Sequence, residues 1–396
     1  MTNAGIFSTE TYAATRRPLH QASALPGWCY ASPEWYEREL DTLFRKDWLC
    51  VGRAEQIPKA GDFFSIELIG HPLIVVRDDA GQVRVHSALC RHRGAVVTEG
   101  QGRCRAFVCP YHSWTYALDG RLVGTPGNPP PMAGAEGFDR AQNGLTPIRA
   151  ETWGGFVFVT FNEQAKPLRE WLGDLPALLA GYELESFQWT HKDVYDVECN
   201  WKVWLENAFE NYHAMTIHRK HMDPNNPQNW VFERTNGPWE AMYSKRSIVA
   251  YSGLPPIPGL DEKKASGLFH IWVQPSVQII LTSSYMKFRQ YLPQGPEKLR
   301  LYENWTFPKS TVALPEFGEL VGPAYYEKYS QIVKEDLGIN PVVQKGMRSG
   351  AYRPGRYSTE EYIVHRIANR VLDRVIGSDP AGSRREREGA PARETA

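Results

Sequence analysis

The stretch CRHRGAVVTEGQGRCRAFVCPYHSW, residues 90–114, contains two short motifs that together fit a metal site. Cys90 and His92 form a Cys-x-His pair, and Cys109 and His112 form a Cys-x-x-His pair, with sixteen residues between them. Each pair lies among glycine, proline and aromatic residues, which favour tight turns. Thiolate and imidazole are the ligands that soft and borderline metal ions prefer. The spacing therefore predicts four metal ligands presented on two loops.

The order of these ligands distinguishes between two kinds of metal site. Zinc fingers usually place their two cysteines together and their two histidines together, whereas here each loop supplies one of each. That order suits a pair of irons, one held by both cysteines and the other by both histidines, as in a Rieske [2Fe-2S] cluster. A structural zinc site and a chance grouping of buried residues remain as alternatives. Because imidazole ligands raise the potential of such a cluster, it would accept electrons readily and act as an electron relay.

A second group of candidate ligands follows in residues 200–218. It comprises Asn200-Trp201-Lys202, Glu206, Asn207, Glu210, His213 and His218. On a continuous helix Glu206, Glu210 and His213 would share one face. His218 would point about 140° away, so both histidines can hold one ion only if the helix ends or bulges between them, and we expect that break at Met215–Ile217. The alternative is a set of ordinary polar residues on a helix surface.

The hydrophobic pattern divides the chain of 396 residues into two larger regions. Residues 48–163 contain short β-rich runs and many turn residues, with a hairpin at 73–85 and a strand at 156–161. Residues 164–377 mix helical segments with longer strands, and this mixture predicts an α+β fold around an antiparallel sheet. The strands expected in the second region are 269–273, 277–281, 288–292 and 299–307.

The two ends of the chain have their own patterns. Residues 1–47 are expected to form an N-terminal helical segment that packs on the second region, with a helix capped by Ser32. A closing helix is expected after the capping box of Ser358 and Glu361, with a glycine as its stop. Residues 378–396 are rich in proline, glycine and charge, so we expect a disordered tail.

Composition excludes several classes of partner. The chain has 45 lysines and arginines against 45 aspartates and glutamates, so no overall charge attracts it to nucleic acid or to an anionic membrane. No apolar run approaches the ~20 residues of a spanning helix. Six cysteines in a chain of this length do not suggest a secreted disulfide framework. We therefore expect a cytoplasmic protein with no nucleic-acid or membrane partner.

The two groups of motifs together closely resemble the catalytic α subunits of Rieske non-haem iron oxygenases, the aromatic-ring-hydroxylating oxygenase family. The resemblance extends from about Trp48 to Ile376 and implies a β-rich Rieske domain followed by a catalytic domain of the helix-grip type. It implies one [2Fe-2S] cluster and one mononuclear Fe(II) per subunit. By resemblance the iron ligands are His213, His218 and Asp336, which belongs to an acidic pair ahead of a Gln-x-Gly-Met-x-Ser stretch.

The resemblance also gives roles to two further residues. Glu210 occupies the position of an acid that links a cluster histidine of one subunit to an iron histidine of its neighbour, and Asn207 matches a family asparagine near the iron. Many members have aspartate at the position of Glu210, and some of those with glutamate act on quaternary ammonium compounds. Ser113 departs from the family, which usually has glycine there. The family wiring implies a homotrimer, with or without a β subunit.

The function implied is that of a terminal oxygenase, which uses O2 and electrons to hydroxylate a small, aromatic substrate or to demethylate it oxidatively. The chain has no Gly-x-Gly-x-x-Gly fingerprint, so NAD(P)H would act through a separate flavin and iron-sulfur reductase, with or without a ferredoxin. One alternative is a monooxygenase or demethylase of a quaternary ammonium or betaine-type compound. The other, from a different class, is a Rieske electron-transfer protein without oxygenase activity.

Overall fold

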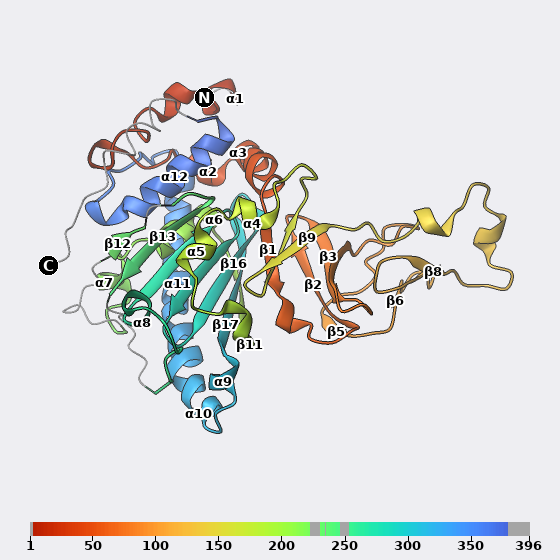
Figure 1. Ribbon diagram of the computed structural model, residues 1–396. Coiled ribbons are helices and arrows are strands. Elements are labelled where there is room, and N and C mark those ends of the chain that lie inside the picture. Colours follow the sequence, from red (N-terminus) through yellow and green to blue (C-terminus); the bar gives the residue numbers. More distant parts are fainter. Residues whose placement is uncertain (1–2, 222–229, 234, 246–252, 379–396) are drawn as a thin grey trace. The chain divides into compact units, whose positions relative to one another are not determined.

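The computed structural model describes residues 3–221, 230–233, 235–245 and 253–378 (Figure 1). The chain forms two compact units. One consists of Met1–Arg45 together with Trp171–Ala396, and the other is Lys46–Glu170. The expected disordered tail, apart from its first residue, lies outside the described residues.

The smaller unit is built from short antiparallel strands in three sheets, ordered β1-β10-β9, β4-β3-β2-β5 and β6-β7-β8. The predicted hairpin is confirmed as β3 and β4, and the predicted strand at 156–161 is confirmed as β10. The strands of this unit are β1 Leu49–Arg53, β2 Asp62–Leu68, β3 His71–Arg77, β4 Val83–Ser87, β5 Gln101–Arg103, β6 Phe107–Val108, β7 Thr115–Tyr116, β8 Leu122–Gly124, β9 Arg149–Trp153 and β10 Phe156–Thr160.

The larger unit is centred on a seven-stranded antiparallel sheet in the described part of the chain, ordered β11-β17-β16-β15-β14-β13-β12. All four strands expected from the sequence are present, as β14 to β17. The strands are β11 Phe187–Val197, β12 Trp230–Phe232, β13 Trp239–Ser244, β14 Leu268–Val273, β15 Val277–Thr282, β16 Met286–Gly295 and β17 Lys298–Pro308. The sheet confirms the predicted α+β class.

Helices pack around this sheet. The two longest, α11 and α12, come last in the chain, and α11 runs along one face of the sheet (Figure 1). The helices are α1 Asn3–Ile6, α2 Trp28–Ala31, α3 Pro33–Glu39, α4 Leu168–Trp171, α5 Leu175–Leu178, α6 Trp201–Ala208, α7 Ala214–Ile217, α8 Glu262–Ala265, α9 Lys309–Val312, α10 Phe317–Val321, α11 Lys328–Arg348 and α12 Tyr362–Val375.

The predicted helix caps are confirmed. Ser32 accepts a hydrogen bond from the backbone N–H of Trp35 at the start of α3, at 3.2 Å. Ahead of α12, the Glu361 side chain accepts a hydrogen bond from the Ser358 backbone N–H at 2.6 Å, as in the predicted capping box. Each cap satisfies backbone donors that a helix start would otherwise leave unpaired.

The N-terminal segment is tied to α6 and α11 by buried polar contacts. The Lys202 ammonium of α6 lies 2.6 Å from the Glu39 carboxylate of α3, and both side chains are fully buried. The Gln344 side chain of α11 donates to the Tyr30 carbonyl at 3.1 Å. Such contacts are expensive to break in the interior, so they fix α6 and α11 against α2 and α3.

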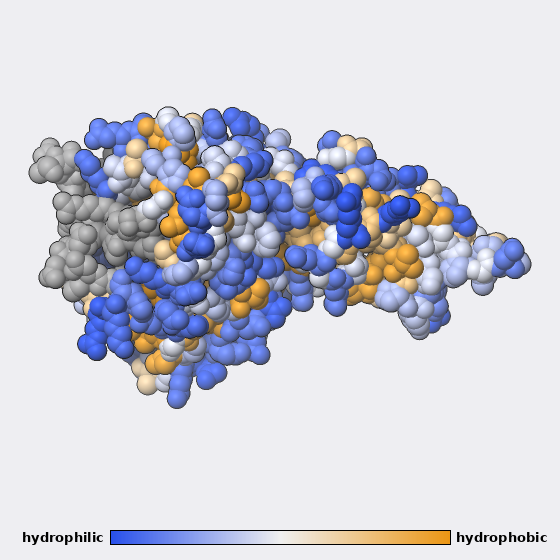
Figure 2. All heavy atoms as spheres, turned by 90° about the horizontal axis from the view of Figure 1, so that it is seen from below, coloured by the Kyte–Doolittle hydropathy of each residue, from blue (hydrophilic) through white to orange (hydrophobic). Residues whose placement is uncertain are grey.

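Within the described residues, no helix has both the length and the apolar character needed to cross a bilayer. Figure 2 shows a face on which hydrophilic residues predominate and hydrophobic ones gather in small groups.

Candidate metal centres

The four residues of the first motif lie on two loops with the same backbone pattern. In the first loop the Gly94 N–H donates to the Cys90 carbonyl at 2.9 Å, and in the second the Ser113 N–H donates to the Cys109 carbonyl at 2.9 Å. Gly94 and Ser113 both have positive φ, 72° and 55°. Since only glycine adopts this conformation without strain, Ser113 carries a strain that a glycine at this position would avoid.

The loops bring the two histidines together. The Nδ1 atoms of His92 and His112 are 3.1 Å apart, and the ring of Trp114 stacks on His92 with centroids 4.9 Å apart. Both cysteines are buried in the core of the unit. Two imidazole nitrogens that lie close together, on the same two loops as two buried cysteines, fit the mixed ligand set of a Rieske cluster, with the histidines on one iron and the cysteines on the other.

Tyr116 makes a further contact with this site that the sequence did not indicate. Its hydroxyl lies 3.2 Å from the Cys90 sulfur and accepts a hydrogen bond from the Arg91 N–H at 3.1 Å. A hydroxyl that accepts from the backbone is free to donate its own proton to a thiolate. Hydrogen bonds to cluster sulfurs raise the reduction potential, so Tyr116 would favour the reduced state.

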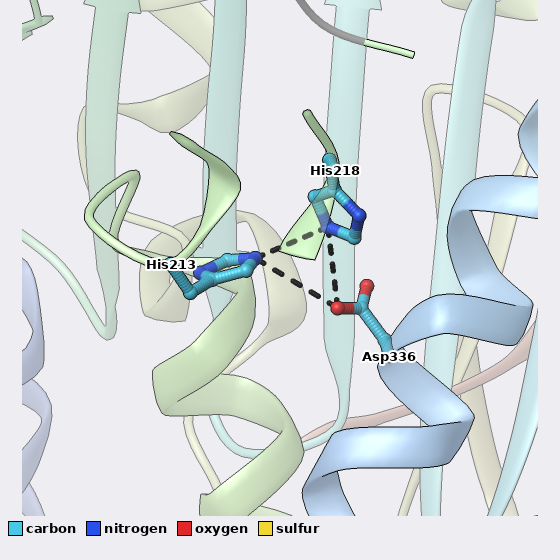
Figure 3. Close-up of side chains that lie close together, drawn as sticks. All are labelled: His213, His218 and Asp336. Carbon is cyan, nitrogen blue, oxygen red and sulfur yellow. Dashed lines mark hydrogen bonds and ion pairs between the residues drawn. The ribbon is translucent and has the colours of Figure 1, made fainter. Parts of the chain in front are cut away.

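The second group converges in the larger unit. His213 and His218 flank α7, and Asp336 projects toward them from α11 (Figure 3). The two Nε2 atoms are 3.2 Å apart, and Asp336 Oδ1 lies 3.2 Å from His218 Nε2 and 3.7 Å from His213 Nε2. One atom from each residue therefore falls within 4.8 Å of the other two. Two imidazoles and a carboxylate are the ligand set of non-haem Fe(II) oxygenases.

The hydrogen bonds made by the Nδ1 atoms of His213 and His218 explain why the three side chains need a bound cation. His213 Nδ1 donates to Glu210 at 2.5 Å, and His218 Nδ1 donates to Glu335 at 2.9 Å. With the proton on Nδ1, each Nε2 presents a lone pair to the other and to Asp336. The buried Asp336 Oδ1 has no hydrogen-bond donor among the described residues. Three facing acceptors fit a bound metal ion.

The raised pKa of His218 also shows that this site stabilises positive charge. Burial alone would lower this pKa, but the carboxylates of Asp336 and Glu335 outweigh burial and raise it. Glu335 is a residue whose role the sequence did not reveal, because an acid beside another acid usually marks an exposed helix face. His221 also lies near this acid, with its Nε2 atom 3.5 Å from Glu335 Oε1.

The predicted helix break is in the wrong place. We expected it at Met215–Ile217, but α6 ends at Ala208 and residues 214–217 form the short α7. The reason is Glu210, whose carboxylate accepts hydrogen bonds from the backbone N–H groups of Tyr212 and His213 and starts a new turn there.

Glu206 and Asn207 lie before this break. The Glu206 carboxylate does not turn toward Glu210 and His213 but accepts a hydrogen bond from the Tyr30 hydroxyl at 2.8 Å. Burial raises the pKa of Glu206 to about 8, and the opposing effects of Tyr30 and Lys202 are smaller. Asn207 is half-buried in the last turn of α6, and its place near the iron stays a prediction.

Two family models match this chain. Residues 47–143 match the Rieske [2Fe-2S] domain, and residues 184–377 match the catalytic domain of the ring-hydroxylating alpha subunit. The chain belongs to the Rieske non-haem iron oxygenases. It is an oxidoreductase, and the two domains imply an iron-sulfur cluster and a mononuclear non-haem iron.

Relatives with assigned activities match the oxygenase over most of their length. Choline monooxygenase of Arabidopsis thaliana is 29% identical over 362 residues, which cover 88% of this chain and 82% of the relative. The oxygenase subunit of glycine betaine monooxygenase from Chromohalobacter salexigens is 28% identical, with 90% and 88% covered.

Solved structures share the fold. A quaternary ammonium Rieske monooxygenase in complex with L-carnitine has a TM-score of 0.74 at 22% identity, with 91% of this chain and 98% of that chain covered. Naphthalene 1,2-dioxygenase from Rhodococcus, bound to indole, has the same TM-score at 20% identity, with 94% and 100% covered. Because both kinds of substrate occur on this fold, the fold alone does not choose between them.

Proposed function

We propose that the oxygenase is the terminal component of a multicomponent system that oxidises a quaternary ammonium compound. The observation that carries this choice is the similarity, over almost the whole chain, to choline and glycine betaine monooxygenases. The aromatic substrate expected from the sequence is the second arm of the test below.

The surroundings of the iron loop support a cationic substrate. Phe209, the residue before Glu210, is buried and stacks on His270 of β14 with centroids 4.7 Å apart. Trp230 of β12 stacks on the same histidine at 6.1 Å. Burial, with the charges of Arg289 and Lys287, lowers the pKa of His270 well below its usual value, so the ring is neutral. Faces of neutral aromatic rings attract quaternary ammonium groups.

In this proposal His213, His218 and Asp336 hold the Fe(II), while Cys90, His92, Cys109 and His112 hold the cluster. The iron supplies oxygen activation beside the substrate. One atom of O2 enters a C–H bond of the substrate, and the other leaves as water after the supply of two electrons and two protons. If the oxidised carbon is an N-methyl group, the N-hydroxymethyl product releases formaldehyde, a proton and the tertiary amine.

Glu210 is the proposed link between the two redox centres. Its carboxylate holds the Nδ1 proton of His213, and a carboxylate has acceptor capacity left for an imidazole N–H of His92 or His112 from a neighbouring subunit. Inter-subunit electron transfer is described for the quaternary ammonium monooxygenase of the same fold.

Exposed side chains support a contact between subunits at both centres. Tyr212 and Met215, beside Glu210 and His218, are 66% and 61% exposed, and Tyr111, beside His112, is 58% exposed. Exposed apolar side chains next to functional residues mark interaction surfaces. We propose a head-to-tail homotrimer, with or without a β subunit.

The test begins with the metals. The purified protein should be red-brown and contain about three irons per chain, whereas a Rieske carrier would contain about two and a zinc protein none. A flavin and iron-sulfur reductase, with or without a ferredoxin, then supplies electrons from cytoplasmic NAD(P)H. Coupled O2 and NADH consumption is measured with choline, glycine betaine and naphthalene. Turnover of naphthalene alone would replace the quaternary ammonium proposal by the aromatic one.

A further inference from the structure

A buried ion cluster lies on the sheet face that α11 covers. Lys287 and Arg289 on β16 share the carboxylate of Glu303 on β17, with Lys287 Nζ 3.1 Å from Oε1 and Arg289 Nε 2.6 Å from Oε2. The exposed fractions of the three side chains are 0%, 8% and 2%. The strand register places Arg289 directly opposite Glu303, so all three project from the same face of the sheet.

The cluster pairs two basic side chains with one hydrogen-bonded carboxylate. The side chain next to Arg289 is neutral: Gln278 accepts from the Tyr291 hydroxyl at 2.6 Å and from Arg289 Nη1 at 3.5 Å, and its amide group also contacts His270. Burial and the charge of Arg289 lower the pKa of Lys287 to about 7 despite Glu303. Two buried basic groups that share one carboxylate are costly to keep charged, so an added anion would stabilise the protonated form of this cluster.

The cluster lies beneath the iron ligands. At one end the Lys287 ammonium is 3.9 Å from the ring centroid of Tyr329, which belongs to the same helix as Asp336. At the other end Gln278 contacts His270, which stacks on Phe209, next to Glu210. Figure 3 shows strands of the sheet passing behind the three iron ligands. The Asp336 carboxylate also acts electrostatically on Lys287 and Arg289, and an Fe(II) held by His213, His218 and Asp336 would offset that negative charge.

Arg289 is the cation of this cluster that retains contact with solvent. Lys287 is completely buried, whereas Arg289 keeps an exposed fraction of 8%, and His270 on the same face is only half-buried. The guanidinium is fixed by Glu303, so it is already oriented and need lose little entropy when it binds an anion.

We propose that Arg289 binds a carboxylate group of the substrate, which makes the substrate a betaine-type zwitterion and not choline. This inference rests on the proposed function, because the trimethylammonium end would then lie toward Phe209, Trp230 and the iron. Glu303 holds the guanidinium in place, and the substrate carboxylate would add a second acid to a site where one acid is shared by the two basic side chains of β16.

Glycine betaine and choline form the matched pair for the test, because they share the trimethylammonium group and differ in the carboxylate. The variant is Arg289→Gln, and the control is Arg300→Gln on β17, an exposed arginine paired with Asp196. In the holoenzyme we expect glycine betaine to bind more tightly than choline. Loss of one charge-assisted contact should weaken glycine betaine binding in Arg289→Gln by about tenfold to a hundredfold and leave choline binding almost unchanged. Isothermal titration and KM values measure both.

Three results would overturn the carboxylate site: tighter binding of choline than of glycine betaine by the unmodified enzyme, equal loss of both ligands in Arg289→Gln, or a loss as large in Arg300→Gln. If Arg289→Gln does not fold, the unmodified enzyme is tested with glycine betaine methyl ester, whose neutral ester should bind as weakly as choline. Ester binding as tight as that of glycine betaine would overturn the inference.

The experiment distinguishes a failure of the carboxylate-site proposal from a failure of the proposed function. Turnover of choline in preference to glycine betaine would remove the carboxylate site and keep the quaternary ammonium function. Binding of benzoate that depends on Arg289, without turnover of any quaternary ammonium compound, would support the carboxylate site and remove that function. Binding of neither glycine betaine nor benzoate would overturn both.

Discussion

The two metal centres are assembled in different ways. The cluster ligands lie on two loops that repeat one backbone turn, each closed by a hydrogen bond from the fourth residue after a cysteine. The iron ligands have no such repeat, because His213 and His218 flank a single helical turn and Asp336 comes from α11. A site made of local turns is encoded by spacing, whereas a site made across a domain depends on how distant elements pack.

Replacing Asp336 should have the largest effect and should remove the mononuclear iron without removing the cluster. Asp336→Ala removes the only carboxylate of the ligand group, so the mononuclear iron and all turnover should be lost while the cluster remains. Iron content should fall by about one per chain with an unchanged Rieske spectrum. Retention of full iron content would show that another residue supplies the third ligand.

Glu210→Gln tests the link between the centres. The amide keeps the size of the side chain but loses the charge that holds the Nδ1 proton of His213. Both metals should remain, and turnover should fall by about a hundredfold. Rapid-mixing spectroscopy of the prereduced protein should show slow oxidation of the cluster with substrate and O2 present. Unchanged turnover would remove the bridging role.

Glu206 supports the iron loop from the other end, and its effect should depend on pH. Its pKa is raised to about 8 in the folded protein, so the folded state binds more protons than the unfolded state between about pH 4.5 and 8. Stability should therefore fall as pH rises through this window. Glu206→Gln cannot ionise and should be more stable than the unmodified protein at pH 8 by on the order of 2 kcal/mol, with little difference at pH 4.5.

Melting temperatures at the two pH values measure this effect, with exposed Glu198→Gln as the control. The same pH dependence in the unmodified protein and in Glu206→Gln would contradict the raised pKa.

Glu335→Gln should weaken the iron site without abolishing it. His218 Nδ1 loses a charged acceptor, which reduces the basicity of Nε2 toward the metal. The affinity for Fe(II) should fall by about tenfold, as measured by metal competition. Glu327→Gln, an exposed acid just before α11, should have no effect, and an equal loss there would indicate a general charge effect.

The smallest effects are expected from one substitution in each cluster loop, and these allow a direct comparison of the two loops. Ser113→Gly should raise the unfolding free energy of the smaller unit by about 1 kcal/mol, because it removes the strain of a positive φ. Gly94→Ala should lower it by about 1 kcal/mol, since no atom would contact the added Cβ and only the φ preference changes. Denaturant unfolding measures both, and effects of the same sign would show that the loops are not equivalent.

The sequence was sufficient wherever the deciding interactions are local. The β-rich runs of β14 to β17, the caps of α3 and the last helix, and the loop motifs each depend on neighbours within a few residues. Chain order also placed both iron histidines in one segment. The break predicted between them was in the wrong place. The Glu210 side chain accepts hydrogen bonds from the backbone N–H groups of Tyr212 and His213, and this contact replaces a continued helix.

Packing between distant segments decided the rest. Glu335 resembles an exposed acid in the sequence, yet the fold of α11 over the sheet brings it to His218. Lys287, Arg289 and Glu303 lie in strands with no motif, and only their register places two cations and one acid on the face below the iron. The sequence thus determined which metals this protein can hold, since their ligands follow short spacing rules. The tertiary structure decided what surrounds the iron, because the register of a sheet and the path of a helix bring together charges that are far apart in the chain.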